Sequence, residues 1–245
     1  MRSEVLFFAT QYKNIARQKI RLPPRRLAHF ANYNNMKYLK WKEEKIIDES
    51  AETISRMYDN GFVFTRIAKG MMHQTRSVRI NLNKFELSSE NRRILRKGEK
   101  VLIEKYTIPY SGYSWEIGKM AKDFYDKKSD GAFSANKIKE LITTPHNFNT
   151  LFSFSNLGFV ICYENSSILH YCYPFYDLEK ALKDMGLIMM TKTIAEAQTL
   201  GLKYVYLGSL QRPNDIYKLQ FSGIEWFDGK EWSNDIEKVK GVLGV

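Results

Sequence analysis

Four residues in the last third of the chain carry side chains or backbone groups that can bind or activate a polar substrate. They are Asp177, Tyr206, Gly208 and Lys218. A carboxylate can bind or deprotonate an amine, and a backbone amide can donate to the oxyanion that forms at an attacked carbonyl. An ammonium group can pair with a carboxylate or a phosphate. The same residues also suit structural roles, since Asp177 can cap a helix and Tyr206 can lie within a buried strand.

The apolar pattern after residue 150 predicts the elements that position these residues. Strands are expected over 150–155, 157–163 and 168–174, followed by a helix over 186–200 and a strand over 204–207. Pairing Tyr163 with Ile168 across the turn places Cys162 opposite Leu169 and Phe159 opposite Cys172. The two cysteines are therefore interpreted as small strand residues that do not pair with each other.

The part of the chain before residue 150 is expected to alternate helices and strands. The expected helices cover 48–60, 88–100, 114–128 and 134–142, and the expected strands cover 61–66 and 75–82. The chain has 245 residues, of which 44% are hydrophobic, so it can bury a sizeable core. The expected fold class is α/β (α+β), with a mixed central sheet over 101–245 and a smaller basic α/β region over 1–100.

The positive charge of the chain lies in its first part. Residues 1–100 hold 22 Lys and Arg against 10 Asp and Glu, whereas residues 101–245 hold 16 against 17, so the two parts carry +12 and −1. Such one-sided charge favours a polyanionic partner such as RNA, although it also suits a solvated surface. The basic residues singled out for a phosphate-rich partner are Lys19, Arg25, Arg26, Arg92, Arg93, Arg96 and Lys97.

Composition also narrows the class of protein. No run approaches the roughly 18 apolar residues of a membrane helix, and the apolar run at 5–9 is too short for a signal peptide. Two cysteines cannot build a disulfide framework. Four widely separated histidines, at 29, 73, 146 and 170, are interpreted as surface or packed residues. A cytoplasmic protein without membrane partners is therefore expected.

Several short motifs occur in an order that resembles the aminoacyl-tRNA–protein transferases, of the arginyl and leucyl branches. The C-terminal motifs are Leu202-Lys-Tyr-Val-Tyr-Leu-Gly208, Tyr217-Lys-Leu-Gln-Phe221 and Asp228-Gly-Lys-Glu-Trp232. The N-terminal motifs are Asn60-Gly-Phe62, Val78-Arg-Ile-Asn-Leu-Asn-Lys-Phe85 and Asn91-Arg-Arg-Ile-Leu-Arg-Lys97. Members of that family move an amino acid from its tRNA to the N-terminus of a protein and so mark it for degradation.

The resemblance implies a fold like that of the GNAT acyltransferases and a set of site residues. Asp177 falls at the family's Tyr-Asp-Pro site and is expected, with Tyr206, to take part in catalysis. Expected to bind substrate are Tyr176, Tyr204, Gly208, Lys218, Arg92 and Arg93, and the strand with oxyanion donors is expected within 175–177 or 204–208. Aminoacyl-tRNA and a peptide N-terminus are the implied partners, and nothing in the sequence gives the oligomeric state.

The chain departs from the family in its cysteines. Members carry cysteines near the N-terminus and after the Gly-Phe pair, and some use them for an iron–sulfur cluster. The corresponding segment here, Lys69-Gly-Met-Met-His-Gln-Thr-Arg76, has none. Because thiolates hold such clusters, no iron–sulfur cluster and no other cofactor are expected.

Three other functions remain open at this stage. A GNAT acetyltransferase using acyl-CoA would need small residues at a helix N-terminus, where this chain has Lys183-Asp-Met-Gly-Leu-Ile188. A non-catalytic RNA-binding protein would keep the basic region and lack the acceptor pocket. A Fem-like ligase would move amino acids from tRNA to an acceptor other than a protein N-terminus.

Overall fold

The computed structural model describes residues 38–128 and 133–245, and residues 38–245 form one compact unit. The elements up to residue 143 are β1 (Lys42–Lys45), α2 (Ala51–Asp59), β2 (Phe62–Phe64), β3 (Met71–Gln74), β4 (Ser77–Asn81), η3 (Leu82–Lys84), α3 (Ser89–Lys97), β5 (Ile103–Thr107), α4 (Trp115–Lys128) and α5 (Ala135–Thr143). The later elements are β6 (Thr150–Phe154), β7 (Gly158–Glu164), β8 (Ile168–Tyr176), α6 (Met185–Thr199), β9 (Tyr204–Ser209), η4 (Pro213–Gln220), β10 (Ile224–Phe227), β11 (Trp232–Ser233) and α7 (Ile236–Leu243).

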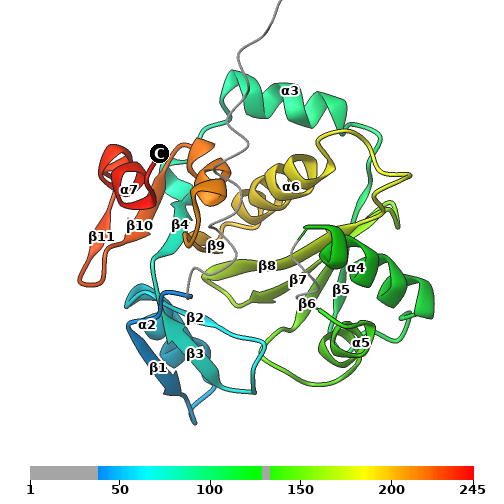
Figure 1. The fold of residues 1–245 in the computed structure, drawn as a ribbon, viewed down its shortest axis with the longest axis horizontal. Helices are drawn as coiled ribbons and strands as arrows, with labels where there is room; N and C mark the ends of the chain where they lie inside the picture. The colour runs from blue at the N-terminus through cyan, green and yellow to red at the C-terminus, as the bar shows by residue number, and fades with distance from the viewer. Residues whose placement is uncertain (1–37, 129–132) are drawn as a thin grey trace, which may run out of the picture. The chain divides into compact units, whose positions relative to one another are not determined.

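The strands form a large mixed sheet and a small antiparallel sheet (Figure 1). The large sheet has the order β11-β10-β4-β9-β8-β7-β6-β5, and the small one has the order β1-β3-β2. Neighbouring strands are antiparallel except β8 and β9, which run parallel. Helix α6 connects that parallel pair. The expected α/β class with a mixed central sheet is confirmed.

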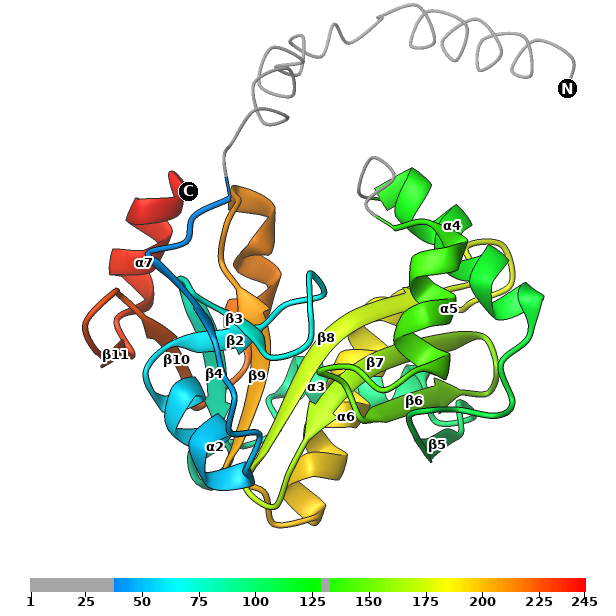
Figure 2. The same ribbon diagram turned by 90° about the horizontal axis from the view of Figure 1, so that it is seen from below.

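The two faces of the large sheet carry separate apolar cores. Along β7, Val160 and Cys162 point into the core shared with α6, whereas Phe159 and Ile161 point into the core shared with α4 and α5. This alternation follows from the two-residue repeat of a strand. The two ribbon views show α6 on the face opposite α4 and α5, with α2 and the small sheet beside β8 and β9 (Figures 1 and 2).

Local signals in the sequence place the helix starts correctly. The Ser88 hydroxyl accepts a hydrogen bond from Asn91 N at 3.1 Å, and the Asn91 side chain accepts one from Ser88 N at 3.2 Å. Ser134 likewise accepts a hydrogen bond from Lys137 N at 3.1 Å. Both serines satisfy backbone donors that the first turn of a helix leaves unpaired. The predictions of helices starting after Ser88 and Ser134 are confirmed.

The predicted pairing of the 157–163 and 168–174 strands is wrong in register. Cys162 lies opposite Tyr171 rather than Leu169, and a bulge follows between Ile161 and Cys162. The side chain of Asn165 accepts hydrogen bonds from Ser167 N at 2.9 Å and Ile168 N at 3.0 Å, and Glu164 pairs with Leu169, so the turn lies one residue later than predicted. The cysteines still do not pair with each other, and both are free thiols.

The large sheet draws strands from both parts of the chain. Strand β4 lies between β10 and β9, so a segment from before residue 100 pairs with two segments from after it. The division of the chain into 1–100 and 101–245 stays a prediction. The described residues show no helix long and apolar enough to cross a membrane.

Candidate functional site

A cavity opens where the parallel strands β8 and β9 separate. The two strands pair only from Ile168 with Tyr204 to His170 with Tyr206, although β8 continues to Tyr176 and β9 to Ser209. Figure 2 shows them diverging from a shared end. A cavity of about 540 Å³ lies at this fork, closed on another side by residues of β2 and β3. We call it the fork cavity; the lining residues used below are Arg66, His170, Gly208, Ser209 and Lys218.

Gly208 gives β9 its shape at the fork. Its φ is +78°, in the region that side chains disfavour. A Cβ at this position would have only His170 Nε2 near it, at 4.0 Å. Glycine therefore keeps open the space between β9 and the imidazole of β8.

Lys218 brings a positive charge to the same cavity. It lies on η4 and is 9% exposed. Its ammonium donates to Ser209 O at 2.7 Å and lies 3.5 Å from a carboxylate oxygen of Asp215. An ammonium has three donors, and the described part of the chain pairs two of them, so a third can meet a ligand. The structure thus brings Gly208 and Lys218 together, as their common assignment to the site requires.

The sequence did not single out His170 as a site residue. The side chain is buried, and its Nδ1 lies 2.8 Å from the hydroxyl of Tyr58 on α2. Burial, with the charge of Lys218 in addition, lowers the pKa of His170 to about 3, so the imidazole is neutral near pH 7. Residues 58 and 170 are far apart in the sequence, and no local pattern marks their contact.

Two cationic side chains line the fork cavity. Arg66 and Lys218 line it, and among the described residues no Asp or Glu does. The Arg66 guanidinium lies over the ring of Phe133, 4.0 Å from its centroid, which fixes one cation against an aromatic wall. The Asp215 carboxylate beside Lys218 offsets part of the charge. The third donor of the Lys218 ammonium can meet an anionic group or the oxygen of a polarised carbonyl.

Asp177 lies outside the fork cavity. Its carboxylate accepts hydrogen bonds from Glu179 N and Lys180 N, both at 2.9 Å, and these bonds lower its pKa. It lines a separate cavity of about 580 Å³ beside α4. The ring of Tyr176 packs against Phe124 of α4, with centroids 4.8 Å apart. The structure therefore does not bring Asp177 and Tyr176 together with Gly208 and Lys218, and their assigned roles stay predictions.

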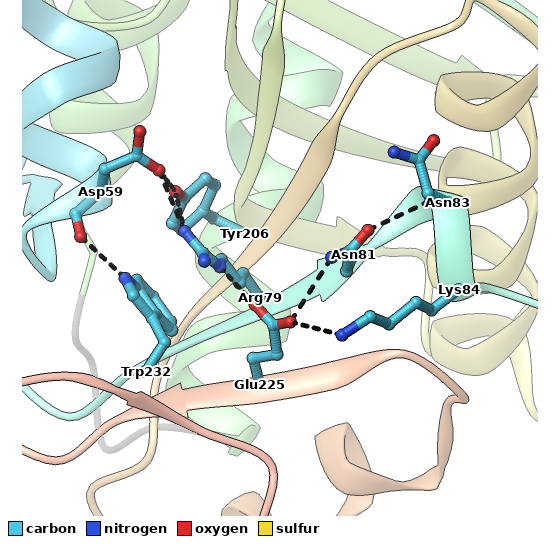
Figure 3. A network of polar contacts seen from close by, with 8 residues as sticks. All are labelled: Asp59, Arg79, Asn81, Asn83, Lys84, Tyr206, Glu225 and Trp232. Atoms are coloured by element: carbon cyan, nitrogen blue, oxygen red, sulfur yellow. Dashed lines mark hydrogen bonds and ion pairs between the residues drawn. The ribbon is translucent and has the colours of Figure 1, made fainter.

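Tyr206 and Tyr204 contact a buried arginine that the sequence analysis did not select. Arg79 on β4 donates to Asp59 at 3.0 Å, to Glu225 at 2.9 Å and to the Tyr206 hydroxyl at 3.3 Å (Figure 3). Its guanidinium lies 3.8 Å from the ring centroid of Tyr204. Both tyrosines are buried in this network, so their predicted roles in catalysis and binding stay untested. Arg79 lies in the Val78–Phe85 motif, and that motif could have identified it from the sequence.

The basic residues of α3 form an exposed face away from the fork. Arg92, Arg93, Arg96 and Lys97 are all exposed. Arg93 pairs with Glu90, and Lys97 pairs with Asp184 at 2.6 Å. Their predicted contacts with tRNA or substrate stay predictions. The other three predicted tRNA contacts, Lys19, Arg25 and Arg26, lie outside the described residues.

The start of α6 is poorly suited to a pyrophosphate. Its N-cap, Asp184, has φ +69° and no side-chain capping bond, and its carboxylate pairs with Lys97. A negative charge at this end opposes a phosphate ligand at the helix N-terminus. Within residues 38–128 and 133–245, no group of three His, Cys, Asp or Glu side chains is arranged to hold a metal ion.

The buried neutral histidine leads to a prediction about acid stability. Between pH 6.5 and about 3, the unfolded chain binds a proton at His170 that the folded protein does not bind, so the free energy of unfolding falls as the pH falls. At pH 4.5 this contribution amounts to about 2–3 kcal/mol. We expect His170→Gln to lose less stability than the unmodified protein between pH 7 and pH 4.5. Urea unfolding at both pH values measures this, and equal losses would contradict it.

Comparison with known proteins gives one sequence relative. No protein-family model matches the chain. The chain is similar to an aspartate/glutamate leucyltransferase from Chromohalobacter salexigens, with 25% identity over 175 residues, which cover 67% of this chain and 70% of that protein. This similarity supports a relationship to the aminoacyl-transferring enzymes, and it does not separate the arginyl branch from the leucyl branch.

Solved structures give weaker likenesses. L-PGS from Bacillus licheniformis matches with a TM-score of 0.44 and 12% identity, covering 80% of this chain and 71% of that one. FemX matches with a TM-score of 0.40 and 10% identity, covering 68% and 61%. A GCN5-related N-acetyltransferase from Kribbella flavida matches with a TM-score of 0.35 and 13% identity, covering 79% and 40%. All three scores are below 0.5, too low to indicate what this protein does.

Proposed function

We propose that the protein transfers an amino acid from an aminoacyl-tRNA to the N-terminal α-amine of a protein or peptide. The observation that carries this proposal is the similarity to the leucyltransferase over 175 residues. The fork cavity supports it, because Gly208, His170 and Lys218 lie together there and offer space, a neutral imidazole and a positive charge. Leucine is accordingly the first donor to test.

The chemistry needs few groups from the protein. The α-amine attacks the ester carbonyl, a C–N bond forms, the C–O bond to the ribose breaks, and a proton from the amine ends on the ribose oxygen. The ester is already activated, so holding both reactants in place supplies much of the acceleration. An α-amine has a pKa near 8, so a weak base or a water molecule can take its proton. The reaction balances without a further cofactor.

The charge of the fork cavity favours an acidic N-terminal residue on the acceptor. Lys218 and Arg66 both line the cavity, and the Lys218 ammonium is buried with the Asp215 carboxylate 3.5 Å away. Buried positive groups bind a carboxylate strongly because few water molecules compete for it. The name of the sequence relative, an aspartate/glutamate leucyltransferase, agrees with this choice. We propose that Lys218 pairs with the acceptor's acidic side chain.

The donor tRNA is proposed to contact basic surfaces outside the cavity. The exposed face of α3 carries Arg92, Arg93, Arg96 and Lys97, and arginine pairs well with phosphate. Lys19, Arg25 and Arg26 are proposed to add to this contact. We expect the affinity for tRNA to fall steeply as the salt concentration rises, because each neutralised phosphate releases counterions.

A transfer assay tests the proposal directly. Purified protein is mixed with leucyl-tRNA carrying labelled leucine and with peptides that begin with each amino acid, and a parallel reaction contains labelled acetyl-CoA. We expect label to move from tRNA to peptides that begin with Asp or Glu. Acetylation in the parallel reaction would support an acyl-CoA enzyme instead. tRNA binding without any transfer would support an RNA-binding protein, and transfer only to a non-peptide amine would support a Fem-like ligase.

Filling the space at Gly208 is expected to block transfer. In Gly208→Val the new side chain would project toward His170 Nε2, so we expect transfer to fall at least about 10-fold. Gly201→Val is the matched control, because Gly201 also has a positive φ, +73°, and has nothing within 4 Å of a new Cβ. Both variants bear similar backbone strain, so a difference in transfer rate reports on the cavity. Equal rates in the two folded variants would contradict this prediction.

A further inference from the structure

His170, which lines the fork cavity, forms a buried pair with Tyr58. Tyr58 is 0% exposed and His170 is 3% exposed, and the tyrosine hydroxyl lies 2.8 Å from imidazole Nδ1. The tyrosine ring also packs edge-on against the imidazole, with centroids 5.5 Å apart. The imidazole is therefore held both by a hydrogen bond and by ring packing, which restricts its rotation.

The surroundings of the hydroxyl decide which imidazole nitrogen carries the proton. Phe64 N donates a hydrogen bond to the Tyr58 hydroxyl oxygen at 3.4 Å. The hydrogen of that hydroxyl needs an acceptor of its own, and among the described residues the structure supplies His170 Nδ1. The opposite arrangement, with Nδ1–H donating to the hydroxyl, would leave a buried hydroxyl hydrogen without an acceptor, which is unfavourable. The network thus selects the tautomer in which Nε2 carries the proton.

The protonated nitrogen points toward the open space at Gly208. A Cβ built on that residue would lie 4.0 Å from His170 Nε2 and would meet no other heavy atom within that distance. The same imidazole lines the cavity with Lys218 and Arg66. A neutral imidazole N–H at this place can donate to a carbonyl oxygen without bringing a further charge into the site.

We propose that His170 is a catalytic residue whose Nε2–H donates a hydrogen bond to the ester carbonyl oxygen as negative charge develops there, and that Tyr58 is the positioning residue that fixes this tautomer. The inference rests on the proposed aminoacyl transfer. A donor aimed at a developing oxyanion stabilises the transition state more than the substrate. Removal of one such donor typically lowers kcat by about 100-fold or more.

Three variants test the two roles. His170→Met removes the donor and keeps an apolar side chain of similar length, so kcat is expected to fall about 100-fold with little change in KM. His170→Gln retains an amide N–H and is expected to keep kcat within about 10-fold of the unmodified protein. Tyr58→Phe frees Nδ1 and is expected to lower kcat about 10-fold, since the imidazole then populates both tautomers. His170→Met with an unchanged kcat would overturn the catalytic role.

Nitrogen NMR of the unmodified protein tests the tautomer, and His170→Gln serves only to assign the signals. The chain contains four histidines, and the imidazole signals missing from His170→Gln identify those of His170. We expect a protonated Nε2 and an unprotonated Nδ1, and the reverse would overturn the inference. In Tyr58→Phe the two nitrogens are expected to become more alike. A tyrosine with only a packing role would leave the tautomer unchanged.

A binding measurement separates failure of this inference from failure of the proposed function. The probe is 3′-amino-3′-deoxyadenosine acylated with leucine, whose amide replaces the reactive ester. Its carbonyl is expected to shift the Nε2–H signal of His170. If the protein shows no transfer, the proposed function fails. If transfer occurs, a shift supports the donor, and no shift on saturation with the probe overturns the inference while the proposed function stands.

Discussion

Arg79→Leu is expected to lower the free energy of unfolding by about 3–5 kcal/mol. The arginine is 7% exposed and pairs with Asp59 and Glu225, and the Glu225 side chain is itself largely buried. Leucine would leave the Glu225 carboxylate without its main partner in a poorly hydrated place. The Arg79 guanidinium also lies 3.9 Å from the ring centroid of Trp232, and that contact would be lost as well.

Urea unfolding followed by circular dichroism measures this effect. Lys119→Leu on α4 is the matched control, because Lys119 also pairs with a carboxylate, Asp123, but at an exposed site. Exposed pairs contribute about 0–1 kcal/mol, so the control is expected to change stability little. A loss below about 1 kcal/mol in Arg79→Leu would show that the network in Figure 3 contributes little to stability.

The sequence predicted elements best where local signals agree. Helix α3 has a serine N-cap, charged exposed positions and Gly98 at its C-cap, and its boundaries were found within a few residues. Strands with no apolar alternation were missed. Strand β1 has the sequence Lys-Glu-Glu-Lys with every residue exposed, and β5 is largely exposed at the edge of the large sheet. Edge strands are often charged, so they carry no hydrophobic pattern to detect.

The sequence predicted only those residues of the site that lie in short motifs. Motifs placed Gly208 and Lys218 in one site, and the structure brings them to one cavity. The Tyr58–His170 contact joins residues 112 positions apart and depends on how α2 packs beside β8. Asp177 was selected for its position in the sequence, whereas its two backbone hydrogen bonds depend on the turn after β8. Contacts between distant elements decide such roles, and periodicity carries no information about them.

Lys218→Met is expected to lower kcat/KM for peptides that begin with Asp or Glu by about 100-fold, while peptides that begin with Asn or Gln change about 3-fold or less. Removing one partner of a desolvated charge pair costs about 2–5 kcal/mol, and 100-fold corresponds to about 2.7 kcal/mol. Methionine keeps the length of the buried stem and removes the ammonium that lines the fork cavity. Within one variant, kcat/KM for peptides that begin with Asp or Glu is compared with kcat/KM for peptides that begin with Asn or Gln. The difference isolates the effect of the negative charge on the acceptor.

The comparison within one variant also distinguishes a lost charge pair from a loss of folded structure. The Lys218 ammonium donates to Ser209 O, so its loss also loosens the contact between η4 and β9. A loosened or partly unfolded enzyme would lose activity toward acidic and amide peptides alike, whereas a lost charge pair affects the acidic peptides only. Lys230→Met, at an exposed position in the turn after β10, is expected to change neither rate. Equal losses for both peptide classes would show that Lys218 stabilises the contact between η4 and β9 and does not bind the acidic side chain of the acceptor.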